Sequence, residues 1–175
     1  MIIDRRRLVA LAATFALAPA VSRVAFAQAW PTRPVRIVVP YAPGGSTDTV
    51  TRITADHLSS IWGHQLVIEN KPGAGTNIGA AAVANSDPDG YTMFIGTSSL
   101  ATSRLLYHSL PYAISDLAAV TLVCTLPLLM VVPNSSPAKS VAAFIAFARE
   151  KKGKVTFASP GVGTAPHLAG ELFKR

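Results

Sequence analysis

The stretch that decides the fold is Val35-Arg36-Ile37-Val38-Val39-Pro40-Tyr41-Ala42-Pro43-Gly44-Gly45-Ser46-Thr47-Asp48. Residues 35–39 are rich in β-branched side chains, so they predict a strand that stops at Pro40. A turn rich in Pro and Gly follows it. Ser46 and Thr47 are predicted caps of the next helix, with Asp48 in its first turn. This passage from a strand through a turn into a helix is typical of α/β proteins.

Strand and helix patterns alternate along the rest of the chain. Further strands are predicted at 66–68, 91–95 and 155–158, and helices at about 77–85, at 100–107, from Ser140 onward and from Pro166 onward. The first helix should stop at Gly63 and bury one apolar face, made of Val50, Ile53, Leu58, Ile61 and Trp62. Cys124 lies in an apolar run and is expected to be buried. The alternation predicts an α/β fold with a largely parallel sheet.

Four segments rich in Gly, Ser or Thr each follow a predicted strand and precede a predicted helix: 42–48, 72–77, 96–99 and 159–164. Ligands of open α/β sheets bind beyond the carboxyl ends of the strands. A helix that begins there offers unpaired N–H groups and the positive end of its dipole. One such segment is an ordinary turn, but four together predict a site for an anion. Thr97 and Ser98 are candidate ligand-binding residues on this basis.

Four ordered motifs carry a resemblance to a known family. They are Arg36-Ile37-Val38-Val39-Pro40-Tyr41-Ala42-Pro43-Gly44-Gly45-Ser46-Thr47-Asp48, Glu69-Asn70-Lys71-Pro72-Gly73-Ala74-Gly75-Thr76-Asn77-Ile78-Gly79, Asp89-Gly90-Tyr91-Thr92 and Gly161-Val162-Gly163-Thr164-Ala165-Pro166-His167-Leu168-Ala169-Gly170-Glu171-Leu172-Phe173. Together they resemble the substrate-binding proteins of tripartite tricarboxylate transporters, also called the Bug family, across residues 30–175. Any one motif alone is weak, whereas the ordered set is specific.

The resemblance implies a periplasmic-binding-protein-like (type II) α/β fold, in which two lobes close over a small organic acid. It also implies delivery of that acid to the integral membrane subunits of a transporter. Members of the family continue well beyond this length. The expected organisation is therefore a signal peptide (1–27), a nearly whole first lobe (28–132) and an incomplete second lobe (133–175).

By the same resemblance, the ligand-binding residues lie in loops of both lobes. Donors of the first lobe hold a ligand carboxylate, partly through waters: Gly44, Gly45, Ser46, Thr76 and Asn77. The second lobe presents three further residues to the cleft: Ser159, Gly161 and Thr164. Asp48 is expected either to orient the first loop or to meet an amine on the ligand. His167 either approaches the ligand or packs against the protein.

The N-terminal residues have the pattern of an export signal. Arg5, Arg6 and Arg7 form a basic region, residues 8–21 are apolar, and Ala25-Phe26-Ala27 is a small-x-small cleavage site. The apolar stretch is shorter than the roughly 20 residues that a membrane-spanning helix needs. Cleavage after Ala27 and a periplasmic location are therefore predicted. A Sec signal is favoured over a twin-arginine signal.

Composition and charge exclude several classes of protein. Half of the 175 residues are hydrophobic and 14% are charged, which favours a packed core over disorder. Residues 1–27 hold four Arg and one Asp, so the net charge falls from +7 to +4 without them. That mild positive charge favours small anionic ligands. The basic run at 149–154 contains no interleaved aromatic residue, so a nucleic-acid partner is not expected. One Cys and four scattered His predict no metal site.

Three rival interpretations are left open. A dinucleotide-dependent oxidoreductase would use Gly73, Gly75 and Gly79, but the spacing G-x-G-x-x-x-G is one residue too long. A serine hydrolase would need a G-x-S-x-G elbow, which the sequence around Ser46 lacks. The third is a degenerate remnant of the family that binds nothing. A binding protein with no catalytic residue and no cofactor is the favoured interpretation.

Overall fold

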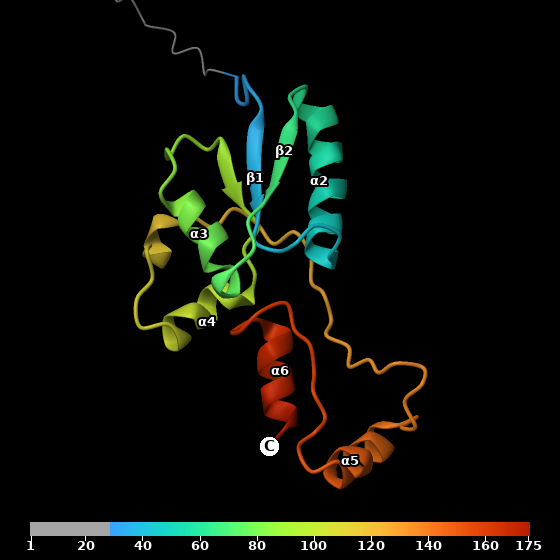
Figure 1. Ribbon diagram of the computed structural model, residues 1–175. Helices are drawn as coiled ribbons and strands as arrows, with labels where there is room; N and C mark the ends of the chain where they lie inside the picture. Colours follow the sequence, from blue (N-terminus) through green and yellow to red (C-terminus); the bar gives the residue numbers. More distant parts are fainter. Residues whose placement is uncertain (1–28) are drawn as a thin grey trace, which may run out of the picture. The chain divides into compact units, whose positions relative to one another are not determined.

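The computed structural model describes residues 29–175, so the predicted signal peptide (1–27) lies outside the described residues (Figure 1). Strands and helices alternate through the first part of this range. The elements in chain order are β1 (Val35–Val39), α2 (Ser46–Trp62), β2 (Leu66–Asn70), the 3₁₀ turn η1 (Ala74–Thr76), α3 (Asn77–Ala84), β3 (Thr92–Phe94), α4 (Ser98–Leu106), the 3₁₀ turn η2 (Ile114–Asp116), α5 (Val141–Glu150) and α6 (Ala165–Phe173). The predicted mixture of helices and parallel strands is confirmed.

The three strands form a parallel sheet in the order β2-β1-β3. Val35 pairs with Leu66 on one side, and Ile37 pairs with Met93 on the other. The central strand β1 is the most deeply buried, because its backbone is paired on both edges and side chains on both faces are covered. Helix α2 packs on one face of the sheet, and α3 contacts β1 and β3 (Figure 1). Strands buried in this way read as continuous apolar runs, as residues 35–39 do.

The predicted apolar face of α2 is partly wrong. Ile53 and Ile61 are 66% and 63% exposed. The residues that face the sheet are Thr51 and Ala55, which are buried, and Leu58 and Trp62, which are partly buried. Their spacing follows the 3.6-residue period of one helical stripe, whereas Ile53 lies on the opposite side of the helix. The angular position of a side chain, and not its hydrophobicity alone, decides whether it is buried.

Residues 154–159, which include the predicted strand 155–158, contain no strand, and Cys124 is exposed instead of buried. Apolar side chains between 120 and 132 are also exposed, as Leu129 and Val131 illustrate at 82% each. A strand forms where a neighbour takes its backbone hydrogen bonds, and an isolated extended segment is not stable in water. Within residues 29–175 these segments pair with no strand. Their sequences favour β structure, but they lack a partner in the described part of the chain.

The ends of the helices agree better with the predictions. Gly63 ends α2 in the left-handed conformation, at φ 68°. The Ser140 hydroxyl accepts a hydrogen bond from the Ala143 N–H and caps α5, and Pro166 lies in the first turn of α6. The predicted capping of α2 by Ser46 and Thr47 is wrong, since Gly45 is its N-cap and makes no side-chain cap bond. A carboxylate from inside the helix stabilises this end instead.

Candidate functional site

Three of the four predicted loops leave the same edge of the sheet, because parallel strands all end on one side. Direct contacts join these loops. The Tyr41 and Thr97 hydroxyls lie 3.1 Å apart, which links the first loop to the third. The Asn70 side-chain amide donates to the Tyr41 carbonyl at 3.0 Å, which links the end of β2 to the first loop. Segments about 30 and 56 residues apart in sequence thus meet at this edge.

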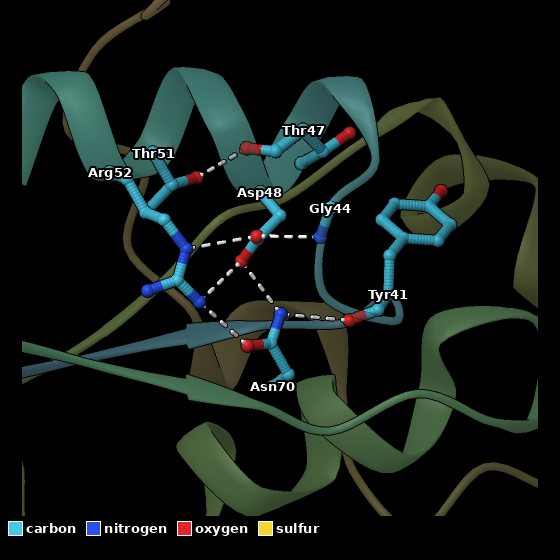
Figure 2. A network of polar contacts seen from close by, with 7 residues as sticks. All are labelled: Tyr41, Gly44, Thr47, Asp48, Thr51, Arg52 and Asn70. Atoms are coloured by element: carbon cyan, nitrogen blue, oxygen red, sulfur yellow. Dashed lines mark hydrogen bonds and ion pairs between the residues drawn. The ribbon is translucent and has the colours of Figure 1, made fainter.

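Asp48 holds the first loop in place through both of its carboxylate oxygens (Figure 2). Oδ2 accepts from the Gly44 N–H at 2.8 Å and from Arg52 Nε at 2.9 Å. Oδ1 accepts from Arg52 Nη2 at 3.0 Å and from Asn70 Nδ2 at 2.9 Å. The side chain is buried, so its charge is balanced within the protein. The Arg52 guanidinium, with help from the Gly44 and Asn70 donors, holds the pKa of Asp48 well below its usual range.

This geometry corresponds to the first predicted role of Asp48, in which it orients the first loop. Its two oxygens already face four donors of the protein. Sequence reasoning missed Arg52 and Asn70 as parts of this network. The spacing of Asp48 and Arg52 at i and i+4 on one helix was the signal that could have identified the ion pair. Nothing comparable marks Asn70, whose place depends on the pairing of β2 with β1.

The second and third loops bring three unpartnered polar atoms into the interior. Thr76 is 2% exposed, Asn77 4% and Ser99 1%. Thr76 Oγ1, Asn77 Nδ2 and Ser99 Oγ have no hydrogen-bond partner in this structure. Thr76 also has φ 88°, a conformation that a β-branched residue rarely adopts. Each buried unpartnered group costs about 1–3 kcal/mol, so this cluster points to a polar ligand or bound water.

These three atoms lie where helices begin. Thr76 is the N-cap of α3, Asn77 is its first residue, and Ser99 is the second residue of α4. The tyrosine Tyr112 also reaches this point, because its hydroxyl donates to Asn77 Oδ1 at 2.7 Å. Sequence reasoning predicted Thr76 and Asn77 and included Ser99 only within the segment 96–99, without naming it as a candidate, and it missed Tyr112. No local motif singles out Tyr112, which reaches the site from 35 residues further along the chain.

The fourth loop packs against the second and against α4. A Cβ on Gly75 would overlap the Val162 carbonyl oxygen, so these two backbone segments are in close contact. The Thr102 hydroxyl of α4 donates to the Gly163 carbonyl at 3.1 Å. Thr164 is fully buried, and its hydroxyl donates to the Gly161 carbonyl at 2.6 Å. The glycine at position 75 therefore allows close packing of two backbone segments.

The other predicted residues lie around this edge with different exposure. Four are exposed: Gly44, Gly45, Ser46 and Ser98. Three are half-buried: Thr97, Ser159 and Gly161. His167 Nδ1 accepts from the Gly163 N–H at 3.4 Å, and its ring lies 6.2 Å from that of Phe157. These contacts place His167 against its own loop and leave a ligand contact as a prediction. Within residues 29–175 no group of His, Cys, Asp or Glu is arranged to bind a metal.

Most of the chain matches one family of known proteins. Residues 50–175 match the family described as the tripartite tricarboxylate transporter family receptor. The chain belongs to this receptor family. A UPF0065 protein from the tcbD-tcbE intergenic region of Pseudomonas sp. (strain P51) is 39% identical to this receptor chain over 171 residues, covering 97% of the chain and 51% of that relative. Protein BugT of Bordetella pertussis is 37% identical over 171 residues, covering 96% and 52%.

Solved structures agree with this assignment. Rpa4515 of R. palustris, solved with adipate, has a TM-score of 0.71 and 36% identity, covering 83% of this chain and 49% of that one. MatC (Rpa3494) of Rhodopseudomonas palustris, solved with bound malate, has a TM-score of 0.72 and 31% identity, covering 83% and 51%. The predicted periplasmic-binding-protein-like fold is confirmed. The receptor chain spans about half the length of the curated relatives it matches. None of its helices in residues 29–175 has the length and apolar character needed to cross a membrane.

We predict that Asp48→Asn lowers the melting temperature at pH 7. The melting temperature of the variant should also fall less steeply than that of the wild type as the pH is lowered. Folding lowers the pKa of Asp48, so its stabilising effect is complete above the usual carboxyl pKa of about 4 and is lost as the pH falls further. The gap between wild type and variant should therefore narrow from about pH 4 to pH 2. Thermal melts followed by circular dichroism across this range test it. Asp87→Asn, at an exposed turn, serves as the control, and a gap that stays constant with pH contradicts the prediction.

We also predict that Gly75→Ala is more destabilising than Gly63→Ala. Both glycines are left-handed, at φ 61° and 68°, so each change costs about 1 kcal/mol in backbone strain. A Cβ on Gly63 meets nothing within 4 Å, whereas one on Gly75 overlaps Val162 and lies 2.9 Å from the Tyr107 hydroxyl. Overpacking should add about 1–3 kcal/mol at Gly75 alone. Urea unfolding of both variants measures the difference, and equal losses would show that the two loops do not pack together.

Proposed function

We propose that this chain forms part of an exported receptor that binds a small dicarboxylate at the carboxyl edge of its sheet. The observation that carries the proposal is the cluster of buried, unpartnered polar atoms on Thr76, Asn77 and Ser99. Two hydroxyls and one amide can donate three hydrogen bonds to a carboxylate. Bonds to an ionised acceptor are the stronger kind, and the positive ends of α3 and α4 add to the attraction.

The remaining predicted residues complete the proposed site. Gly44, Gly45 and Ser46 offer backbone and hydroxyl donors from the first loop, whose shape depends on Asp48. Thr97 and Ser98 lie beside the cluster in chain order, at the start of α4. The fourth loop contributes the residues that would face the ligand from the second lobe: Ser159, Gly161, Thr164 and His167. In this proposal residues 28–132 form the first lobe and residues 133–175 form the start of the second.

The choice of a dicarboxylate has its support in the relatives. Rpa4515 was solved with adipate and MatC with malate, and both of these ligands carry two carboxylates. One carboxylate would meet the cluster at α3 and α4. The second would be recognised by the part of the receptor that closes over it. Delivery of the ligand to the membrane subunits of a tripartite tricarboxylate-type transporter follows from the family and is part of the same proposal.

The proposal of export predicts cleavage of the chain after Ala27 in a bacterial host. The Ala25-Phe26-Ala27 pattern stands at the correct distance from the apolar stretch. The periplasmic fraction should then contain a species that begins at Gln28, which intact-mass spectrometry identifies. An Ala27→Arg variant is the matched control, since it removes a small residue from the cleavage site and should retain the signal. A periplasmic species that keeps residues 1–27 in the wild type would contradict this.

We predict that Thr76→Val lowers affinity for adipate or malate without lowering stability. The change keeps the shape of the side chain and removes its hydroxyl. Losing a hydrogen bond to a charged group costs about 1.5–3 kcal/mol, or about ten- to a hundredfold in dissociation constant. Stability of the free protein should not fall, because the hydroxyl has no partner there. Isothermal titration calorimetry and thermal melts measure the two effects.

Thr54→Val is the matched control for this change. The Thr54 hydroxyl donates to the Val50 carbonyl within α2 at 2.9 Å, so its loss should leave affinity unchanged. A receptor that contains this chain together with the part that closes over the ligand, and that binds neither dicarboxylate, would contradict the proposed function. If wild type and Thr76→Val bind the dicarboxylate with equal affinity, the carboxylate site of the receptor does not include the Thr76 hydroxyl.

A further inference from the structure

The side chain of Asn77 has two different ends, and one of them is already engaged. Its carbonyl oxygen Oδ1 accepts a hydrogen bond from the Tyr112 hydroxyl at 2.7 Å. Its amide nitrogen Nδ2 is buried without a partner. An amide can rotate by half a turn and exchange an acceptor for a donor with almost no change of shape. The bond from Tyr112 therefore decides which end of Asn77 is presented to a ligand.

Tyr112 is itself a buried residue. The residue is 9% exposed and lies in the chain between the end of α4 and the start of η2. The next residue, Ala113, donates its N–H to the Asp116 carboxylate at 2.8 Å, which fixes the chain immediately after the ring. Burial raises the pKa of the Tyr112 phenol, against an opposite effect of the Ser103 hydroxyl. An ordinary tyrosine pKa is about 10, so the phenol carries its proton near neutral pH and acts as the donor to Asn77.

We propose that Tyr112 is a positioning residue for ligand binding: its hydroxyl fixes Oδ1 of Asn77, so that Nδ2 is presented as a donor to a ligand carboxylate. This inference rests on the proposed function. If the amide were reversed, its carbonyl oxygen would face the carboxylate, and two acceptors in contact repel each other. Tyr112, 35 residues away in sequence, would thus make the site prefer a ligand group that accepts a hydrogen bond over one that donates.

The first test replaces Tyr112 by Phe, which keeps the ring and removes the hydroxyl. Asn77 can then rotate, and the donor faces the ligand for part of the time only. Affinity for adipate should fall about tenfold, the loss expected for a weakened bond to a charged group. Tyr91→Phe is the matched control, since the Tyr91 hydroxyl accepts from the Thr32 N–H at 2.9 Å, away from the carboxyl edge of the sheet. Its affinity for adipate should equal that of the wild type.

A double-mutant cycle shows whether Tyr112 acts through Asn77. In an Asn77→Ala background the amide is gone, so Tyr112→Phe should change adipate affinity less than about twofold. The same tenfold loss in both backgrounds would overturn the proposal, because Tyr112 would then act independently of Asn77. Asn77→Asp gives a second line of evidence if Tyr112→Phe fails to fold. It keeps an acceptor for Tyr112 but replaces the donor with an oxygen, and adipate binding should be lost.

Nuclear magnetic resonance of the free protein provides a readout that needs no ligand. The side-chain amide signals of Asn77 are identified as those missing from Asn77→Ala. They should shift in Tyr112→Phe and stay in place in Tyr91→Phe, and adipate should shift them in the wild type. Unchanged signals in Tyr112→Phe would overturn the positioning role. If the receptor binds neither adipate nor malate, the proposed function is wrong, and whether Tyr112 fixes the side-chain amide of Asn77 is judged from these signals alone.

Discussion

The parallel pairing of β1 with β2 and β3 is the constraint on which the rest of the structure depends. It brings three strand ends to one edge of the sheet, and therefore three loops and three helix starts to one place. The contacts from Tyr41 to Thr97 and to Asn70 exist because of that arrangement. Strand β1 is deeply buried because it carries apolar side chains on both faces. A site assembled from distant segments needs such a scaffold to hold its donors within hydrogen-bond distance.

The helix starts at this edge are used in two different ways. At α2 the protein supplies its own anion, because the Asp48 carboxylate accepts from the Gly44 N–H and is balanced by Arg52. At α3 and α4 the protein leaves buried polar atoms without a partner, on Thr76 and Ser99 among others. The first arrangement fixes a loop and contributes stability. The second sacrifices stability and makes sense if an external group completes it.

Local chemistry decided which parts of this structure could be predicted from the sequence. The stop at Gly63 was predictable because it depends on residues adjacent in the chain. Strand β1 was predictable because its sequence favours a strand and its partners β2 and β3 lie in the described part of the chain. Thr76 was predictable as a candidate from its motif, but not its orphaned hydroxyl or its left-handed backbone. Ser99 was predicted only as part of the segment 96–99 and Tyr112 was missed, since their burial results from packing between distant segments. The strand predicted at 155–158 failed for the same reason, because pairing needs a partner that composition cannot reveal.

Two cations at this edge are paired with acidic side chains, which is consistent with the proposal that neutral donors bind the anion. Arg52 binds Asp48, and Lys71, which directly follows β2, lies 3.0 Å from Glu69. Both cations thus have an acidic partner, and the donors of the proposed cluster are uncharged hydroxyl and amide groups. Such donors lose strength in competition with water and gain it when water is excluded. A receptor built in this way should hold its ligand when enclosed and release it when opened, whereas a fixed cation would hold the anion in both states.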